Sequence, residues 1–303
     1  MGETHDHHEH YRRSGGSSHL LLALILTLAT LLAEAIGGWL SGSLALLADA
    51  GHLLVDALAL LLAWGGARIA LRPADARRSY GYGRMEVLAG YTNALAQFGL
   101  SAWIVYEAIL RFSDPQPIES GLMLAVAVVG LAVNVLVMRM IGSHAHDDVN
   151  LAGARLHVLG DLLGSLAAVA AALLIRYRGW LVADPALSVV VALLILRSAW
   201  SLLRRCAHIL LEGAPDDVRS DDLAAAIESE TGIDGVHHVH VWQLAGGYRI
   251  ATLHARVQAG AEAGAALRTI QHTLREHFGI AHATIQIESG DCASADCDEV
   301  HSH

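Results

Sequence analysis

Two histidine–aspartate pairs with the same spacing lie inside apolar stretches of this 303-residue chain. His52 precedes Asp56 by four residues, and His157 precedes Asp161 by four residues. In a helix, residues four apart share one face and are separated by about 6 Å along the axis. Two such helices facing one another would bring two imidazoles and two carboxylates to one point. Zinc accepts this four-coordinate ligand set of nitrogen and oxygen.

A single buried His–Asp pair has other interpretations, namely a structural hydrogen bond or a proton relay without metal. Two copies of the spacing in separate apolar stretches favour a metal site, because ionisable side chains inside membrane helices are costly and rare. Imidazole titrates near neutral pH and binds metal only when deprotonated, so metal and protons compete for the same nitrogens. The pattern therefore predicts a transport site that exchanges outbound metal for inbound protons.

Three further polar residues in the apolar stretches have less certain roles. Asp49 lies three residues before His52 and is expected to orient a ligand rather than to bind the ion. Asn134 predicts a hydrogen bond between helices. Glu34 has no evident partner in the sequence.

The C-terminal third contains a second group of metal-binding residue types, among them His237, His238 and His282. The candidate ligands of a possible cytoplasmic site are His240, His254, Glu288, Cys292 and Cys297. Imidazoles and thiolates together suit zinc, although this spacing is looser than that of a zinc finger. Such a site could sense metal. Histidines also cluster at 5–10 and 144–146, where they form either weak capture sites or solvated polar segments.

The composition indicates a membrane protein. Hydrophobic residues make up 54% and charged residues 17% of the chain, against about 45–50% and about 25% in soluble domains. A membrane-spanning helix needs about 20 apolar residues. Six stretches qualify, at 19–40, 44–71, 85–110, 119–141, 151–176 and 180–203.

The arginines predict the orientation of these spans. Most of them flank the ends on one side of the membrane, whereas Arg111, Arg176 and Arg178 flank the other. Because arginine is enriched on the cytoplasmic side, and because six spans return the chain to the side where it began, both termini are expected to be cytoplasmic. The expected location is the inner membrane of the cell.

The net charge of −10 is concentrated in the C-terminal third, where the apolar stretches stop. The pattern there predicts helix, strand, strand, helix and strand (αββαβ), an α+β domain with helices on one face of a small sheet. The expected fold is thus an α-helical membrane protein with six transmembrane helices and a cytoplasmic α+β domain. The predicted parts are a His-rich tail (1–18), the transmembrane domain (19–206), the cytoplasmic metal-binding and dimerisation domain (207–290) and a Cys/His tail (291–303).

Several segments resemble the cation diffusion facilitator family, in particular its zinc-exporting branch. The segments are the run from Ser43 to His52 followed by Asp56, the run from Tyr80 to Glu86, the pair His157 and Asp161, and the run from His282 to Glu288. This resemblance covers roughly residues 19–290.

The resemblance implies a homodimer that exchanges zinc for protons by alternating access, with cadmium or cobalt often tolerated. It implies a cytoplasmic domain like that of copper chaperones, a ferredoxin-like fold. Some relatives have a zinc site in the loop between spans two and three. Here that loop contains Arg72, Asp75 and Arg77 but no histidine, so the site is not expected. With Gln286 and Glu288 on the last strand, a two-metal cluster is not expected either.

Three alternatives remain at this point. An intramembrane metalloprotease is disfavoured because the chain has no His-Glu-x-x-His motif and no nucleophile beside a base, so the protein is not expected to be an enzyme. A proton-relay channel or receptor would use the His–Asp pairs without metal. Transport of mainly another divalent ion, such as cadmium, cobalt or nickel, would use the same ligands. The expected partners are membrane lipid, divalent ions and a second copy of the chain, and no nucleic acid.

Overall fold

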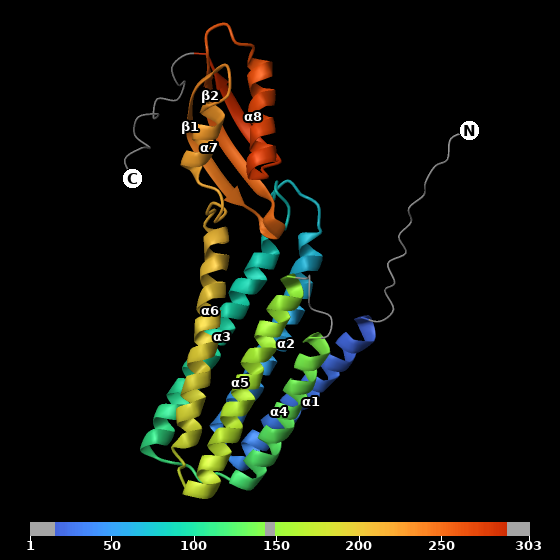
Figure 1. Cartoon of the computed structure of the whole chain (residues 1–303), viewed down its shortest axis with the longest axis vertical. Helices are drawn as coiled ribbons and strands as arrows, with labels where there is room; N and C mark the ends of the chain where they lie inside the picture. Colours follow the sequence, from blue (N-terminus) through green and yellow to red (C-terminus); the bar gives the residue numbers. More distant parts are fainter. Residues whose placement is uncertain (1–15, 143–148, 290–303) are drawn as a thin grey trace, which may run out of the picture. The chain divides into compact units, whose positions relative to one another are not determined.

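The computed structural model describes the backbone of residues 16–142 and 149–289, and the side chains of 25–140, 158–244 and 246–289. The chain forms two compact units (Figure 1). The first comprises Met1–Ala59 and Asn93–Trp200, and the second comprises Leu60–Thr92 and Ser201–His303. The domain boundary near residue 207 stays a prediction, because the second unit also includes residues 60–92.

Six long helices occupy the six predicted apolar stretches. They are α1 (Gly16–Ser41), α2 (Leu44–Ala70), α3 (Arg84–Ser113), α4 (Ser120–Gly142), α5 (Val149–Arg178) and α6 (Ala183–Leu210). Within the described residues, α2, α4, the segment Val158–Arg178 and α6 are long and apolar enough to cross a membrane, and Ile25–Ser41 is a shorter apolar helix. The prediction of a helical, multi-pass membrane domain is confirmed.

Small side chains line the contacts between the helices of the first unit. One buried cluster joins residues of α2, α4, α5 and α6, and its alanines are Ala45, Ala127, Ala168, Ala171, Ala172 and Ala183. Small residues let helix backbones approach closely in a membrane, where packing rather than water exclusion holds helices together. Large apolar residues such as Leu32, Leu136 and Leu193 are instead exposed, as expected of a lipid-facing surface.

Asp184, near the start of α6, fixes the start of α2. Its carboxylate accepts hydrogen bonds from the Ser43 hydroxyl at 2.7 Å and from the backbone N–H groups of Leu44 and Ala45 at 2.7 and 3.1 Å. The Arg111 guanidinium lies 3.7 Å away. The side chain of Asp184 is fully buried. A carboxylate at a helix N-terminus satisfies orphan N–H groups and interacts favourably with the helix dipole.

We expect Asp184→Ala to destabilise the protein by about 3 kcal/mol or more, because three donors at the start of α2 would be left buried without their acceptor. Arg111 would lose one of its two acidic neighbours and keep Glu107. Thermal unfolding of the detergent-solubilised protein measures this loss. Asp114→Ala is the matched control, since Asp114 is an exposed aspartate of the loop after α3. Equal melting temperatures for the two variants would contradict the proposed role of Asp184.

The C-terminal part of the second unit is an α+β fold. Its elements are α7 (Ser220–Glu228), β1 (Ile233–Gln243), the short helix η1 (Ala245–Gly247), β2 (Arg249–Val257), α8 (Ala263–Phe278) and β3 (His282–Glu288). The sheet order is β1-β2-β3, with β1 antiparallel and β3 parallel to β2. The predicted αββαβ order is confirmed.

One hydrophobic core joins both helices to the same face of this sheet. Leu223 and Ile227 of α7 and Ile270 and Leu274 of α8 are fully buried there, together with Leu253 of β2. Along β2 the buried residues alternate with partly exposed ones. Because side chains alternate between the faces of a strand, residues such as His254 lie on the face away from the helices.

Candidate metal centres

The structure brings three of the predicted transport ligands together. His52 and Asp56 project from α2, and Asp161 projects from α5. The Nε2 atom of His52 lies 3.4 Å from Oδ2 of Asp56 and 3.7 Å from Oδ1 of Asp161. One ligand atom from each residue lies within 4.8 Å of the others. Asp161 is buried, and the other two residues are partly buried. The distance across the two helices is therefore short enough for one ion to contact all three side chains.

The fourth predicted ligand, His157, has a side chain outside the described residues. Its backbone belongs to α5, one helical turn before Asp161. Residues four apart lie on the same helix face, so the backbone is consistent with the predicted i,i+4 pair.

Gln97 of α3 contacts the transport cluster and was not predicted from the sequence. Its Nε2 donates a hydrogen bond to Oδ1 of Asp56 at 3.2 Å. This bond occupies one carboxylate oxygen and restrains the orientation of the other. A glutamine inside the third apolar stretch was the available signal, and its partner could not be found without knowing how α2 and α3 pack.

Asp49 belongs to a buried polar chain that crosses three helices. Ser165 of α5 donates its hydroxyl to Oδ2 of Asp49 at 3.2 Å and accepts a hydrogen bond from Nδ2 of Asn134, on α4, at 3.0 Å. Asn134 thus makes the kind of bond between helices that the sequence predicted. Asp49 is 2% exposed and is not one of the three clustered ligands. Its place beside α5 fits a role in holding α2 and α5 together.

Glu34 of α1 is 1% exposed, and its carboxylate oxygens have no hydrogen-bond partner among the described residues. It packs against Gly130 of α4, where an added Cβ would collide with the Oε1 atom of Glu34. A larger residue at this contact would force the Glu34 side chain to move. Among the described residues, no hydrogen-bond donor offsets the cost of burying Glu34.

We expect Gln97→Leu to weaken metal binding at the transport cluster by about tenfold, because losing a group that orients a ligand typically costs 10–100-fold in affinity. Zinc titration of the purified protein would measure the change. Gln116→Leu is the control, since Gln116 lies in an exposed loop and its side chain donates hydrogen bonds to Asp114. Unchanged zinc affinity in Gln97→Leu would show that the bond to Asp56 does not restrain the ligand.

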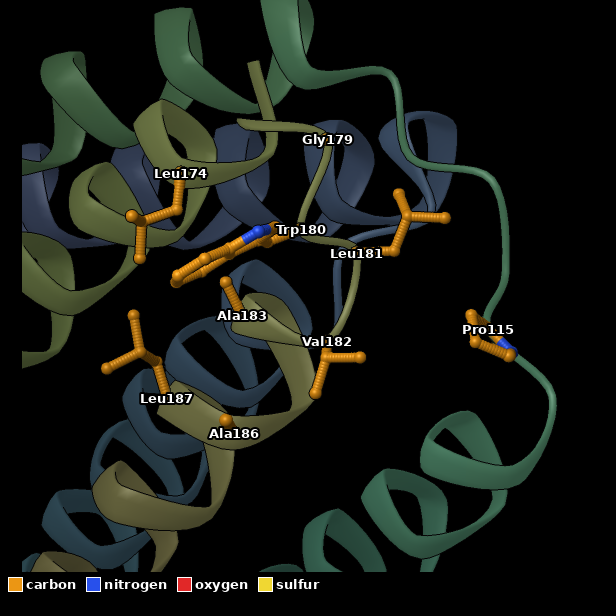
Figure 2. A pocket seen from close by; sticks show the side chains of 9 residues that line it. All are labelled: Pro115, Leu174, Gly179, Trp180, Leu181, Val182, Ala183, Ala186 and Leu187. Carbon is orange, nitrogen blue, oxygen red and sulfur yellow. The ribbon is translucent and has the colours of Figure 1, made fainter. Parts of the chain in front are cut away.

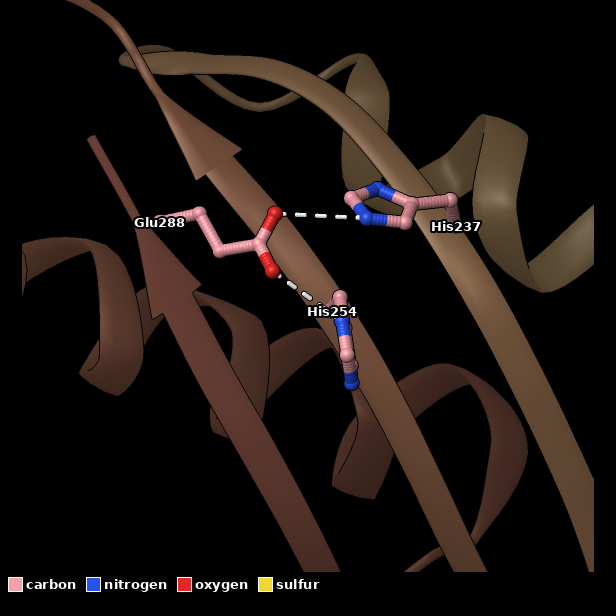
Figure 3. A group of neighbouring side chains, drawn as sticks. All are labelled: His237, His254 and Glu288. Carbon is pink, nitrogen blue, oxygen red and sulfur yellow. Dashed lines mark hydrogen bonds and ion pairs between the residues drawn. The ribbon is translucent and has the colours of Figure 1, made fainter. Parts of the chain in front are cut away.

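A second cluster lies on the open face of the sheet (Figure 3). Oε2 of Glu288 is 3.2 Å from Nε2 of His237, and Oε1 of Glu288 is 3.1 Å from Nδ1 of His254. Gln286 donates a further hydrogen bond to Oε1 of Glu288 at 2.8 Å. Glu288 is buried, and one ligand atom from each of the three clustered residues lies within 4.8 Å of the others. The group offers two nitrogen donors and one carboxylate to a metal ion.

The register of the strands explains which residues form this cluster. His237 of β1 lies opposite His254 of β2, whereas His240 lies opposite Thr252 and is exposed. The structure thus groups the predicted His254 and Glu288 with His237 and leaves His240 outside. Cys292 and Cys297 lie outside the described residues. The register could not be read from the sequence, since β1 contains three histidines within four residues.

The environment of His237 favours the form that binds metal. Burial lowers the pKa of its imidazole, although the nearby Glu288 carboxylate opposes this effect. A lower pKa keeps the ring neutral at physiological pH, and a neutral imidazole is the species that coordinates a metal ion.

One apolar hollow in the first unit does not resemble either cluster. It has a volume of about 730 Å³ and lies where α5 ends and α6 begins (Figure 2). Leu174, Trp180 and Leu187 are among the residues that line it, and none of its lining residues is an acid, a histidine or a cysteine. This hollow therefore offers no ligand to a metal ion.

The fold and the two clusters define a multi-pass membrane protein with a C-terminal α+β domain. The family model of the cation efflux transmembrane domain matches residues 20–211, and that of the cation efflux protein cytoplasmic domain matches residues 215–290. The chain therefore belongs to the cation efflux, or cation diffusion facilitator, family, as the resemblance predicted.

Relatives are similar over nearly their whole length. The "Zinc transporter ZitB" of Pectobacterium atrosepticum is 45% identical over 98% of this chain and 92% of the relative. The "Cadmium, cobalt and zinc/H(+)-K(+) antiporter" of Bacillus velezensis is 40% identical over 95% of this chain and 92% of the relative. The "Metal cation efflux system protein CzcD" of Cupriavidus metallidurans is 40% identical over 97% of this chain and 92% of the relative.

Proposed function

We propose that the protein exports zinc from the cytoplasm in exchange for protons, through a site formed by His52, Asp56, Asp161 and His157. The observation that carries this proposal is the convergence of His52, Asp56 and Asp161 from α2 and α5 at mutual ligand-atom distances within 4.8 Å. The zinc transporters among the relatives support the choice of ion.

The chemistry of the ligands supports zinc over harder ions. Imidazole nitrogen suits zinc and other late transition metals, whereas magnesium, calcium and manganese prefer sites of carboxylate, carbonyl and water oxygens. Cadmium, cobalt and nickel accept similar ligands, so transport of these ions is the second candidate for the same site. The relative named for cadmium, cobalt and zinc supports this broader selectivity.

Proton exchange follows from the ligand type. Each histidine must be deprotonated to bind metal, so protonation from the far side of the membrane favours release of the ion. The name of the B. velezensis relative includes H⁺ as a counter-ion, which supports the exchange. We further propose a homodimer with both termini in the cytoplasm of the cell, located in the inner membrane. The match to the cytoplasmic domain of cation efflux proteins supports the assembly.

We expect Asp161→Asn to reduce zinc uptake into proteoliposomes to the level of protein-free liposomes, because the cluster would lose its buried carboxylate. A zinc indicator and a pH indicator inside the vesicles would report both fluxes. Asp114→Asn, on an exposed loop, should behave as the parent does. Zinc flux without an opposing proton flux would remove the exchange, and full zinc flux in Asp161→Asn would remove the site.

The same vesicles test the remaining alternative, a proton relay without metal. A relay would conduct protons in the absence of zinc and would bind no zinc at His52 or Asp161. We expect the opposite, namely a proton flux that depends on zinc and is lost together with zinc transport in Asp161→Asn.

We also expect zinc binding to weaken as the pH falls, since protons and zinc compete for imidazole nitrogen. Below about pH 6.5 the dissociation constant should rise roughly tenfold per pH unit for each imidazole that must lose its proton. Calorimetric titration of a Glu288→Gln variant, in which the cytoplasmic cluster is disabled, isolates the transport site. Adding His52→Asn should make the dependence shallower, and an unchanged slope would exclude His52 as a ligand.

A second function is favoured by the cluster on the cytoplasmic sheet. We propose that His237, His254 and Glu288 bind a zinc ion that regulates the protein and is not itself transported. The support is geometric, because two imidazoles and a buried carboxylate gather on one face of the sheet (Figure 3). Loss of one tightly bound zinc from Glu288→Gln, with the transport site intact, is the measurement that tests this proposal.

A further inference from the structure

Strand β1 contains one extra residue beside the cytoplasmic cluster. His237 lies opposite His254, and the next paired residue, His240, lies opposite Thr252. Three steps along β1 therefore face two steps along β2, which is the pattern of a β-bulge. Bulges redirect side chains and are common beside functional sites.

The bulge places two adjacent imidazoles on the same side of the sheet. In a regular strand, neighbouring side chains point to opposite faces. Here Val236 and Val239 both pack against the helix-covered core. The two residues between them, His237 and His238, both have their rings beside that of His254. The His238 ring centre lies 5.4 Å from that of His237 and 5.0 Å from that of His254, while the latter two are 5.3 Å apart. The three imidazole rings are thus mutual neighbours, and His238 lies beside the cluster of His237, His254 and Glu288.

His238 has two unfavourable features at this position. Its backbone has a φ of +49°, in the left-handed region that disfavours residues with a Cβ. Its Nε2 atom is buried and has no hydrogen-bond partner among the described residues. Strained backbone and unsatisfied buried polar atoms persist where a function compensates for them.

We propose that His238 is a ligand of the cytoplasmic zinc ion and completes a four-coordinate site with His237, His254 and Glu288. The inference rests on the regulatory zinc site proposed above and extends it by one residue. Three nitrogens and one carboxylate oxygen fill the tetrahedral coordination of zinc. A filled coordination shell leaves no open position, which is typical of structural zinc sites rather than of sites that pass the ion on.

The neighbouring residues favour His238 over other fourth donors. His240 is exposed and pairs with Thr252, one step further along the strand. Gln286 is already bonded to Glu288. With His238 as a ligand, the ion would join the bulge of β1 to β2 and to the end of β3. Zinc would therefore stabilise the sheet as well as report the metal concentration.

The test uses the full-length protein with His52→Ala and Asp161→Ala, so that the membrane site no longer contributes. Weakly held zinc is removed with a chelator, and the remaining zinc is examined by chelator competition and by X-ray absorption, which counts imidazole ligands. Two substitutions of His238 are compared. His238→Asn tolerates a left-handed backbone, and His238→Gly removes the strain altogether. His240→Asn is the matched control on the same strand.

The parent of this comparison is the protein with His52→Ala and Asp161→Ala. We expect three imidazoles per zinc in this parent and two in both His238 variants. The zinc affinity should fall by about 100-fold in these variants, since losing a group that only hydrogen-bonds to a ligand already costs about 10–100-fold. The control should bind as the parent does. Without metal, His238→Gly should melt no lower than the parent, and zinc should raise its melting temperature less.

Three results would overturn the inference, and they differ from one another. Two imidazoles in the parent, with unchanged affinity in His238→Asn, would exclude His238 while leaving the three-residue site. Sulfur scattering that disappears in Cys292→Ser or Cys297→Ser would assign the fourth position to the C-terminal tail. If Glu288→Gln retains all of its tightly bound zinc, the regulatory site itself is absent, and the inference fails with it.

Discussion

An ionisable side chain in the membrane interior is costly unless it has a partner, and for three aspartates this constraint organises the first unit. Asp49 and Asp161 are almost fully buried, and Asp184 is completely buried. Each has polar or ionisable partners on another helix: Asp49 accepts a bond from α5, Asp161 faces His52 of α2, and Asp184 caps α2 from α6. Buried aspartates inside and outside the candidate metal cluster therefore specify how α2, α5 and α6 pack. Alanines and Gly164, which lies against Asp49, permit the close approach of these helices.

The two clusters use the same donor types on different frameworks. In the membrane, the i,i+4 spacing of a helix presents His52 and Asp56 together, and a second helix adds Asp161. In the cytoplasmic sheet, a cross-strand pair presents His237 and His254, and the parallel neighbour β3 adds Glu288. The helical spacing is visible in the sequence because it is local. The strand cluster depends on register, which is set by contacts between distant segments.

The predicted transport ligands therefore match the observed helical cluster more closely than the predicted cytoplasmic ligands match the sheet cluster. Apolar stretches of membrane length located all six helices, and strand alternation with a Gly-Gly turn located the hairpin. The sequence could not reveal the bulge in β1, because an extra residue among His237, His238 and His240 changes which of them faces His254. It also could not identify Gln97 or Ser165 as partners of Asp56 and Asp49, since those contacts exist only once the helices are packed.

The secondary structure that holds the ligands also determines whether an ion can leave. The ligands of the membrane cluster come from two helices, and helices held by small side chains can slide or tilt without breaking their internal backbone hydrogen bonds. Such a movement separates His52 from Asp161 and opens the coordination of the ion. The ligands of the cytoplasmic cluster are fixed to adjacent strands, and separating them would break the backbone bonds between β1, β2 and β3. The same imidazoles and carboxylates thus suit a carrier in the helices and a retained ion in the sheet.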